Sequence, residues 1–446
     1  MEYLERQAEL VPVLLEEINI LKEQFRLSIN GKNSSTSHTP PSHQIGRSNT
    51  KSLRVKSSRT SGGQVGHKGT TLPFKQMPDE IIIHSPAICT CCGLDLKNTP
   101  SVKLEKRQEV VIPPVQIKYV EHISHTKICE GCGHKTTGTF PENIKAPIQY
   151  SGHIGALVAY LSVFHYMPYG RITILLKDFF GISMSQGTVD NLLKSATKKA
   201  QPVYNIIQQR IQNEAVVGSD ETGTRINGGK GWFHTWQSEK LTFIAASLDR
   251  GFKTIVRYFA DGFTKSVYVS DCWAAQLKVA ARLHQLCLAH LLRELNNFED
   301  ALSCKWSTLL KTIFCDAIQL KKEMLETDYH ITNEKVIAIE QMFDKLLLNR
   351  KDASDNKKVQ AFINRLEKNR NSIFTFLHYH YVPPDNNASE RAIRNIKIKT
   401  KVSGQFRSEA GATRFAVIRS VIDTTRKNGN NILNALCVMF NYSPEL

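Results

Sequence analysis

Apolar side chains near the start of the chain recur at steps of three and four residues, the spacing of an α-helix with one apolar face. They are Leu4, Val11, Leu14, Ile18, Leu21 and Phe25. The same spacing is that of a coiled-coil seam, which favours dimerisation. Pro12 interrupts the early turns and the run is short, so a single amphipathic helix packing on its own chain is the alternative. We place this helix within residues 1–30.

The helical spacing of apolar residues is absent between residues 31 and 78. From Arg26 to Pro78 there is no Asp or Glu, whereas basic residues accumulate among Ser, Thr, Gly and Pro: Lys32, Arg47, Lys51, Arg54, Lys56, Arg59, Lys68 and Lys75. Such a composition cannot build a core, so the sequence predicts a basic flexible arm. The arm suits contact with phosphates, and it also serves as a solvated linker.

Residues 79–148 combine a strand-like run, QEVVIPPVQIKYVEHISHTKI, with two C-x-x-C-G knuckles formed by Cys89, Cys92, Cys129 and Cys132. The glycine after each pair permits a tight turn that points backbone amides at sulfur, and four thiolates complete the tetrahedral shell of Zn²⁺. We predict a β-rich, zinc-ribbon-like module with a structural zinc ion. Other potential ligands are close in sequence: Cys91, His84, His122, His125 and His134. Two redox-active dithiols are the rival interpretation, although no βαβ pattern surrounds them.

Residues 149–212 return to helical periodicity. One helix is predicted through Phe180, followed by a turn at Gly181, an N-cap at Ser183 or Ser185, and a second helix to about Lys199. This is the spacing of a DNA-binding helix-turn-helix, and an ordinary αα-hairpin is the alternative. The predicted DNA contacts are Ser185, Gln186, Thr188, Asn191 and Lys194.

From Glu214 the period changes to that of strands. The runs AVVGSDETGTRI, GWFHTWQS and LTFIAASLD precede a helical GFKTIVRYFA and a further strand, SVYVSD. Three antiparallel strands, a helix and a parallel strand follow the order of an RNase H-like fold. Carboxylates at the middle of its first strand and the end of its fourth lie on adjacent strands, and Asp220 and Asp271 match those places. We assign residues 213–280 to the first part of this catalytic core.

Helical sequence fills the gap of about 120 residues between Asp271 and Glu390. That is too long for a loop, so an α-helical insertion is predicted over residues 281–382, and residues 383–446 complete the core with C-terminal helices. Cys287 and His290 lie one helical turn apart within the insertion. They could bind metal or DNA, or merely pack and orient a neighbour. The fold class is therefore α+β and multidomain.

Each of the three acidic residues also has a simpler explanation. Asp220 suits a turn, Asp271 suits the cap of a helix WAAQLKVAARL, and Glu390 suits a capping box with Asn387. Together they favour chemistry, because both aspartates follow apolar strands and three convergent carboxylates require divalent cations. The helix that Glu390 opens also carries a basic stripe suited to DNA phosphates: Arg394, Lys397 and Lys401.

Composition narrows the choice of partner. The 58 Lys and Arg residues exceed the 41 Asp and Glu residues, giving a net charge of +17 and a polyanion as the natural partner. No apolar run approaches the roughly 20 residues of a membrane-spanning helix, and the N-terminus lacks a secretion signal. The sequence thus predicts a cytoplasmic protein without membrane contact. Ten cysteines are too few for a disulfide scaffold in a chain of this length.

Several of these motifs together resemble the IS66 family of bacterial insertion-sequence transposases over nearly the whole chain. The matching pieces are RTSGGQVGHKGTTL, the two knuckles, DET at Asp220, VSDCWAAQ, CLAHLLREL and PPDNNASERAIRNIKIKTKVSGQFRSEAGATRFAVIRSVIDTTRKNG. The resemblance implies catalysis by Asp220, Asp271 and Glu390 with Mg²⁺ or Mn²⁺. The expected reaction is cleavage at the insertion-sequence ends and transfer of the 3′-OH to target DNA.

The resemblance also implies partners: terminal inverted repeats, target DNA, further copies of the chain, and accessory proteins of the same element, in a nucleoid-associated location. Departures are small, since Trp273 stands where tyrosine is commoner, Cys91 is extra and the chain ends at NYSPEL. One alternative is a DNA-binding regulator or domesticated transposase without strand transfer. Another is a metal-dependent RNase or junction resolvase.

Overall fold

The computed structural model describes residues 66–440, with the exception of residues 70, 114, 116, 328, 330–332, 351–352 and 354–355. The predicted helix within residues 1–30 lies outside the described residues, as do residues 31–65 of the predicted basic arm and the final NYSPEL. Contacts divide the chain into two compact units, Ser48–Lys118 and the remainder, and each is described by itself.

Regular structure is sparse in the region predicted to be a β-rich module, residues 79–148. Its described part contains one antiparallel hairpin, β1 (Thr126–Ile128) with β2 (Lys135–Thr137), and an isolated bridge elsewhere. Among the described residues of the strand-like run QEVVIPPVQIKYVEHISHTKI, only the last three form a strand. The prediction of strand is wrong for the rest of its described residues, because the valines and isoleucines there are exposed and have no core to pack against.

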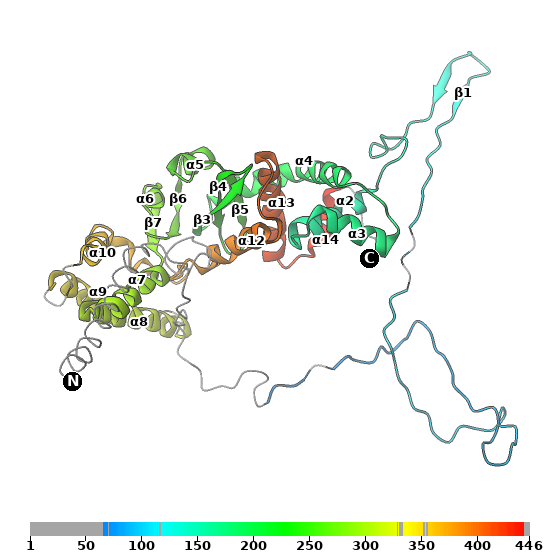
Figure 1. Ribbon diagram of the computed structural model, residues 1–446, viewed down its shortest axis with the longest axis horizontal. Coiled ribbons are helices and arrows are strands. Elements are labelled where there is room, and N and C mark those ends of the chain that lie inside the picture. Colours follow the sequence, from blue (N-terminus) through cyan, green and yellow to red (C-terminus); the bar gives the residue numbers. More distant parts are fainter. Residues whose placement is uncertain are drawn as a thin grey trace, which may run out of the picture. The chain divides into compact units, whose positions relative to one another are not determined.

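Five strands form one mixed sheet in the order β5-β4-β3-β6-β7 (Figure 1). Strands β3, β4 and β5 are antiparallel, whereas β6 pairs parallel with both β3 and β7. Asn227 and Gly228, both with positive φ, make the two-residue turn that aligns β3 with β4. This arrangement matches the predicted order of three antiparallel strands, a helix and a parallel strand. The elements are β3 (Val216–Ile226), β4 (Gly229–Gln237), β5 (Thr242–Ser247), α5 (Phe252–Tyr258), β6 (Phe263–Ser270) and β7 (Ala281–Leu286).

Strand β7 corrects a sequence-based expectation. The run WAAQLKVAARL was predicted to be one helix, but helix α6 covers only Ala274–Leu277 and the chain then enters β7. Parallel pairing with β6, which sets Leu283 opposite Val267, outweighs the helical propensity of the local sequence. The sheet therefore extends to Leu286, and the helical insertion begins after it instead of at residue 281.

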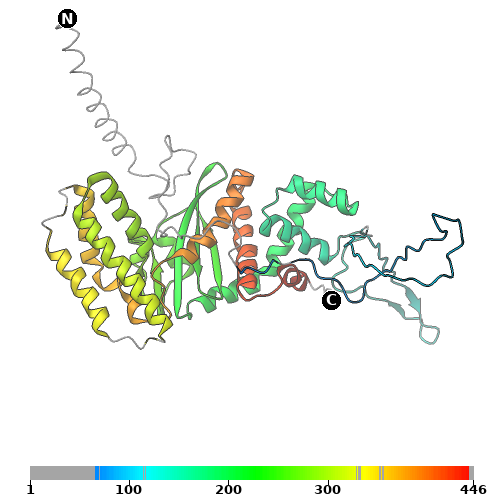
Figure 2. The ribbon, with the colours of Figure 1, turned by 90° about the horizontal axis from the view of Figure 1, so that it is seen from below.

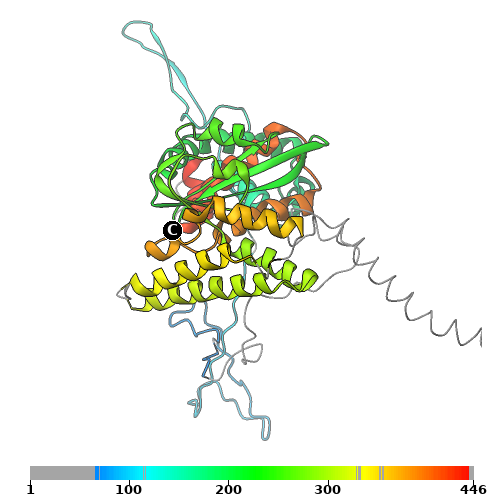
Figure 3. The ribbon, with the colours of Figure 1, turned by 90° about the vertical axis from the view of Figure 1, so that its left-hand side faces the viewer.

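The insertion is a layer of helices packed on the β6 and β7 side of the sheet. In Figure 2 the strands lie between the insertion helices, drawn in yellow and yellow-green, and the orange and red C-terminal helices, and in Figure 3 the insertion runs below the strands. Its aromatic core includes Trp306, Phe314 and Phe343, and it is continuous with Val267 and Val269 of β6. The elements are α7 (Leu288–Leu302), α8 (Lys305–Glu326), α9 (Asn333–Leu348), α10 (Lys357–Lys368), η3 (Arg370–Ser372) and α11 (Thr375–His378).

The remaining helices pack around the other strands. Helix α4 continues well past the predicted end at Lys199, because its buried positions keep helical spacing through Tyr204, Ile207 and Ile211, while Pro202 removes only one helical hydrogen bond. Among the helices that the structure describes, none combines the length and the apolar character needed to cross a membrane. The elements are α2 (Gly152–Ala159), η2 (Tyr160–Phe164), α3 (Tyr169–Phe180), α4 (Gln186–Ile211), α12 (Asn387–Ser403), α13 (Glu409–Lys427) and α14 (Ile432–Met439).

Candidate active site

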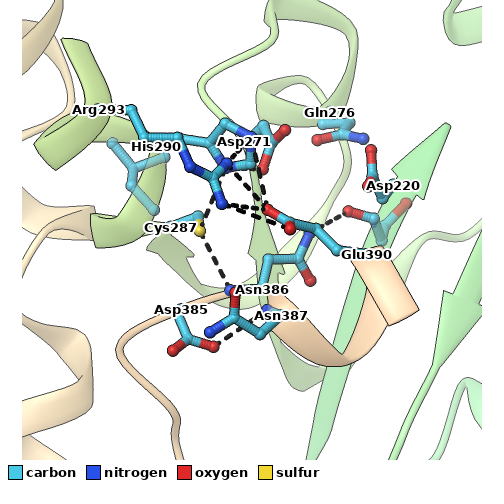
Figure 4. Close-up of polar contacts among 12 residues, drawn as sticks. Asp220, Asp271, Gln276, Cys287, His290, Arg293, Asp385, Asn386, Asn387 and Glu390 are labelled. Atoms are coloured by element: carbon cyan, nitrogen blue, oxygen red, sulfur yellow. Dashed lines mark hydrogen bonds and ion pairs between the residues drawn. The ribbon is translucent and has the colours of Figure 1, made fainter. Parts of the chain in front are cut away.

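Two of the predicted acidic residues lie on neighbouring parallel strands. Asp220 is within β3, and Asp271 follows the last residue of β6. The register sets Gly218 opposite Val269, and residues two apart on a strand face the same side of the sheet. Asp220 and Asp271 therefore face the same side at the point where β6 ends (Figure 4).

The Asp220 carboxylate is buried beside other negative charges. Burial raises its pKa well above the usual range, and the charges of Asp271 and Glu221 raise it further. Asp220 Oδ1 accepts a hydrogen bond of 2.8 Å from the Glu221 backbone N–H, which partly opposes this shift. Two neighbouring carboxylates of this kind are both ionised only when a cation compensates them.

Glu390 lies in the first turn of α12, and the start of that helix is pinned to the strand that carries Asp220. Asn386, the N-cap, donates from its side-chain amide to the Ser219 carbonyl at 2.6 Å instead of capping the helix. The predicted capping box between Asn387 and Glu390 is wrong, because Asn387 is already helical and the Glu390 N–H bonds the Asn386 carbonyl. The Glu390 carboxylate is thereby left for other partners.

Close approach of α12 to β3 depends on a glycine. A Cβ atom at Gly218 would lie 2.6 Å from Ser389 Oγ and 2.8 Å from Asn386 Oδ1. Real Cβ contacts are longer, so a side chain at this position requires a shift of the Ser389 and Asn386 side chains or of α12 itself. The glycine thus allows the start of α12, which carries Glu390, to lie this close to β3.

Cys287 and His290, whose role the sequence left open, join the site. His290 Nδ1 lies 2.9 Å from Asp271 Oδ1 and 3.3 Å from Cys287 Sγ. The ligand atoms of these three residues all lie within 4.8 Å of one another, the spacing of a group that could hold a metal ion. His290 Nε2 also lies 3.8 Å from Glu390 Oε1, so a single imidazole spans the distance between Asp271 and Glu390.

Arg293 is a site residue that the sequence reasoning missed. Its Nη1 and Nη2 atoms each donate to Glu390 Oε1 at 3.0 Å, and Nη2 also reaches Oε2 at 3.4 Å. Nη1 lies 3.0 Å from His290 Nε2. The signal was present in CLAHLLREL, because positions 287, 290 and 293 recur every three residues and share one face of a helix.

The two α7 side chains bring positive charge to the carboxylates. Burial opposes the charge of His290, but hydrogen bonds to Asp271 and Cys287 outweigh it and raise the pKa of His290 to about 11. Burial likewise opposes the charge of Arg293, and the Glu390 carboxylate raises the pKa of Arg293 in spite of it. Asp271 and Glu390 therefore each have a cationic partner within the protein.

A second polar cluster, formed by Glu221, Arg250 and Gln276, connects the residues that follow the two aspartates. Glu221 is buried, and its carboxylate accepts from Arg250 Nη2 at 2.7 Å and from Gln276 Nε2 at 2.8 Å. The Arg250 guanidinium carbon lies 4.9 Å from the ring centroid of Trp232 and 4.5 Å from that of Trp273. These contacts tie the chain after Asp220 to the chain after Asp271.

The predicted helix-turn-helix residues lie at the start of α4. Gly181 ends α3 in the left-handed conformation, and Ser185 Oγ caps α4 by accepting the Thr188 N–H at 3.0 Å. Gln186, Asn191 and Lys194 are exposed, as a groove-reading surface requires, and Thr188 is half-buried. Asp190 pairs with Lys194 at 2.9 Å and also with Arg414, so this surface is not uniformly positive.

The predicted basic stripe continues from the active site along α12. Arg394, Lys397 and Lys401 are all exposed, and they follow Glu390 at steps of four, three and four residues. Such spacing places the four side chains along one face of the helix. The positive charge therefore starts one turn beyond the Glu390 carboxylate.

Each cysteine knuckle has the turn that the sequence predicts. Gly93 and Gly133 adopt positive φ and donate to the carbonyls of Cys89 and Cys129 at 2.9 and 2.8 Å. Backbone N–H groups of Cys92 and then Cys91 lower the pKa of the Cys89 thiol, and those of Cys132 and Gly131 lower the pKa of Cys129. The two knuckles fall in different compact units, so each is described by itself.

Comparison with known proteins places these observations in a family. The sequence model described as "Transposase IS66 family" matches residues 147–414, which include all three acidic residues and α7. A curated relative, the uncharacterized protein y4hP of Sinorhizobium fredii, is 22% identical over 396 residues, covering 79% of this chain and 71% of the relative.

Proposed function

Because the chain belongs to the IS66 family of transposases, we propose that it is a DNA transposase of the Asp-Asp-Glu type. In this proposal it cleaves DNA at the ends of an insertion sequence and joins the freed 3′-OH to target DNA, with Asp220, Asp271 and Glu390 as metal ligands. Membership of the family implies a nucleic-acid-processing enzyme and DNA as its partner. The specific reaction and the roles of the three acidic residues go beyond family membership and are what we propose.

One observation carries the proposal. Asp220 lies on β3 and Asp271 directly follows the adjacent parallel strand β6. The helix that carries Glu390 in its first turn is bonded to the strand of Asp220 through Asn386 and Ser219. The strand order β5-β4-β3-β6-β7, with one antiparallel half and one parallel half, supports an RNase H-like core around these residues. The order of the first four strands was expected from the sequence, whereas β7 was not.

The donor set fits Mg²⁺ or Mn²⁺. The three side chains offer only carboxylate oxygens, which hard divalent cations prefer. The raised pKa of Asp220, caused by burial and then by Asp271, indicates a pair that needs positive charge. Bound metal ions would supply activation of the attacking oxygen and stabilisation of the leaving oxygen. The chain itself holds the carboxylates in place through Asn386, His290 and Arg293.

The remaining modules take supporting roles in this proposal. The start of α4, with Ser185, Gln186, Thr188, Asn191 and Lys194, binds the terminal inverted repeats, and Arg394, Lys397 and Lys401 contact DNA phosphates beside the cleavage site. Cys89, Cys92, Cys129 and Cys132 together bind a structural zinc ion. Further copies of the chain and accessory proteins of the same element complete the assembly.

The test is a Mg²⁺-dependent joining assay with the native insertion-sequence ends. Asp220→Asn, Asp271→Asn and Glu390→Gln are expected to abolish both cleavage and strand transfer while DNA binding survives. Asp261→Asn, at an exposed aspartate outside the site, is the matched control and keeps full activity. Full activity in any of the three site variants would refute the assignment.

Two outcomes would point to other functions. Wild-type protein that binds the ends but joins nothing, with or without the accessory proteins, would favour a DNA-binding regulator or domesticated transposase. Metal-dependent hydrolysis without strand transfer would favour a nuclease or junction resolvase with the same core.

A further inference from the structure

The contact between Arg293 and Glu390 has a consequence for metal binding. We propose that Arg293 is a positioning residue that holds Glu390 in the metal-free protein as a substitute cation, and that a metal ion competes with it for the same carboxylate. This inference rests on the proposed metal site and adds a residue from the helical insertion to it.

The geometry indicates that Arg293 and a bound metal ion compete for the Glu390 carboxylate. Nη1 and Nη2 of Arg293 both donate to Glu390 Oε1, and Nη2 also reaches Oε2 at 3.4 Å, so the guanidinium contacts both carboxylate oxygens. The two side chains are only 31% and 19% exposed, so solvent screens the pair weakly. A metal ion bound by Glu390 uses one or both of these oxygens and repels the guanidinium. Metal binding through Glu390 therefore weakens or displaces the contact with Arg293.

The backbone around α7 keeps Arg293 at this place. The Cys287 N–H donates to the Ser270 carbonyl at 2.9 Å, which ties the start of α7 to the end of β6. Cys287 Sγ accepts the Asn386 N–H at 3.1 Å, which ties it to the chain entering α12. Arg293 lies less than two turns further along the same helix. Its reach to Glu390 is thus set by contacts on both flanks of the site.

A competing cation and a purely structural ion pair predict opposite changes in metal affinity. If Arg293 competes, its removal frees the Glu390 oxygens and takes one positive charge from beside Asp271, so metal binds more tightly. If Arg293 only supports the fold, its removal lets Glu390 move, and metal binds as before or more weakly. The sign of the change separates these two roles, and impaired folding cannot produce tighter binding.

The experiment is a calorimetric titration of the full-length, DNA-free protein with Mn²⁺, which favours oxygen ligands over the cysteine thiolates. Arg293→Gln is expected to lower the Mn²⁺ dissociation constant roughly tenfold, as for the loss of a partly buried bidentate competitor. Arg293→Lys keeps the charge but cannot donate from two nitrogens at once. Its Mn²⁺ dissociation constant is expected to lie between those of wild type and Arg293→Gln. An unchanged or weaker affinity in Arg293→Gln would overturn the proposal.

Two further variants make the outcome specific. Arg365→Gln removes an ion pair of similar exposure, 2.7 Å long, with Glu294, the neighbour of Arg293 in sequence. It is expected to leave Mn²⁺ affinity unchanged, and a tenfold gain there would also count against a local competition. Glu390→Gln tests the site itself. If Glu390→Gln binds Mn²⁺ like wild type, the proposed metal site fails, whereas loss of binding there with no gain in Arg293→Gln refutes only the role of Arg293.

Discussion

Apolar side chains are buried in one region of the molecule and exposed in another. In the sheet region, residues 150–440, Trp236 and Phe314 are completely buried. In the knuckle region, residues 79–148, Val110 and Ile112 are 77% and 87% exposed. Burial of apolar surface stabilises the first region directly. The second gains little in this way. If its cysteines bind the proposed zinc ion, its stability depends on that ion, and we expect the two regions to respond differently to the same perturbation.

Loss of zinc has the largest expected effect, and it is confined to the knuckle region. Under the proposed zinc site, Cys129→Ser, or chelation, removes a structural ion whose binding is worth on the order of 10 kcal/mol in small zinc domains. We expect the bound zinc to be lost and the knuckle region to become sensitive to protease. Tryptophan fluorescence gives the control, because all four tryptophans lie in the sheet region: Trp232, Trp236, Trp273 and Trp306. A fall in the fluorescence melting temperature would mean that the two regions unfold together.

The second largest expected effect comes from a mutation that creates a cavity in the core of the insertion. Phe314→Ala is expected to lower the free energy of unfolding by about 3–5 kcal/mol, because the ring is fully buried against Phe343 and Phe374. Ile112→Ala is the matched change in the knuckle region and is expected to stay within about 0.5 kcal/mol. Urea denaturation followed by circular dichroism measures both. Equal losses in the two variants would show that Ile112 is also packed.

Acid is expected to destabilise the sheet region through His234. Burial lowers the pKa of His234 to about 4, and its ring bonds the Asp249 carbonyl at 3.1 Å. An unfolded histidine takes up its proton near pH 6.5, so the stabilisation is complete above about pH 6.5 and is lost as the pH falls toward 4.

The expected loss of unfolding free energy between about pH 6.5 and 4 is about 3 kcal/mol, and urea denaturation at several pH values in this range measures it. His234→Gln is expected to flatten the dependence, whereas His122→Gln, at an exposed position in the knuckle region, leaves it unchanged. A slope that survives in His234→Gln would assign the effect to another group.

The smallest expected change in stability is at Gly218. Gly218→Ala places a methyl group against Ser389 and Asn386, at a cost of about 1–3 kcal/mol. It is also expected to reduce metal-dependent joining, because Glu390 moves with α12. Gly69→Ala meets open space in the other compact unit and is the control. Unaltered joining in Gly218→Ala would show that the position of α12 tolerates a shift.

Local sequence was enough to predict the order of β3, β4, β5 and β6 and the neighbouring places of Asp220 and Asp271. Apolar residues mark these strands, as Val216 and Val217 do at the start of β3, and the Asn227–Gly228 turn fixes the first hairpin. The failures involve partners distant in sequence. Strand β7 depends on pairing with β6, and the side chain of Asn386 bonds Ser219, 167 residues away, where a local cap was expected. Arg293 contacts a residue 97 positions away, which periodicity alone does not reveal.

The two ends of the insertion are already joined where they leave the sheet. The Leu288 N–H donates to the Pro384 carbonyl at 2.9 Å, and Cys287 meets Asn386 beside them. A segment whose ends touch can change length at little entropic cost to the host. The insertion can therefore change length at its far end, provided that the first turns of α7 and the helices that share a core with Val267 and Val269 of β6 stay in place.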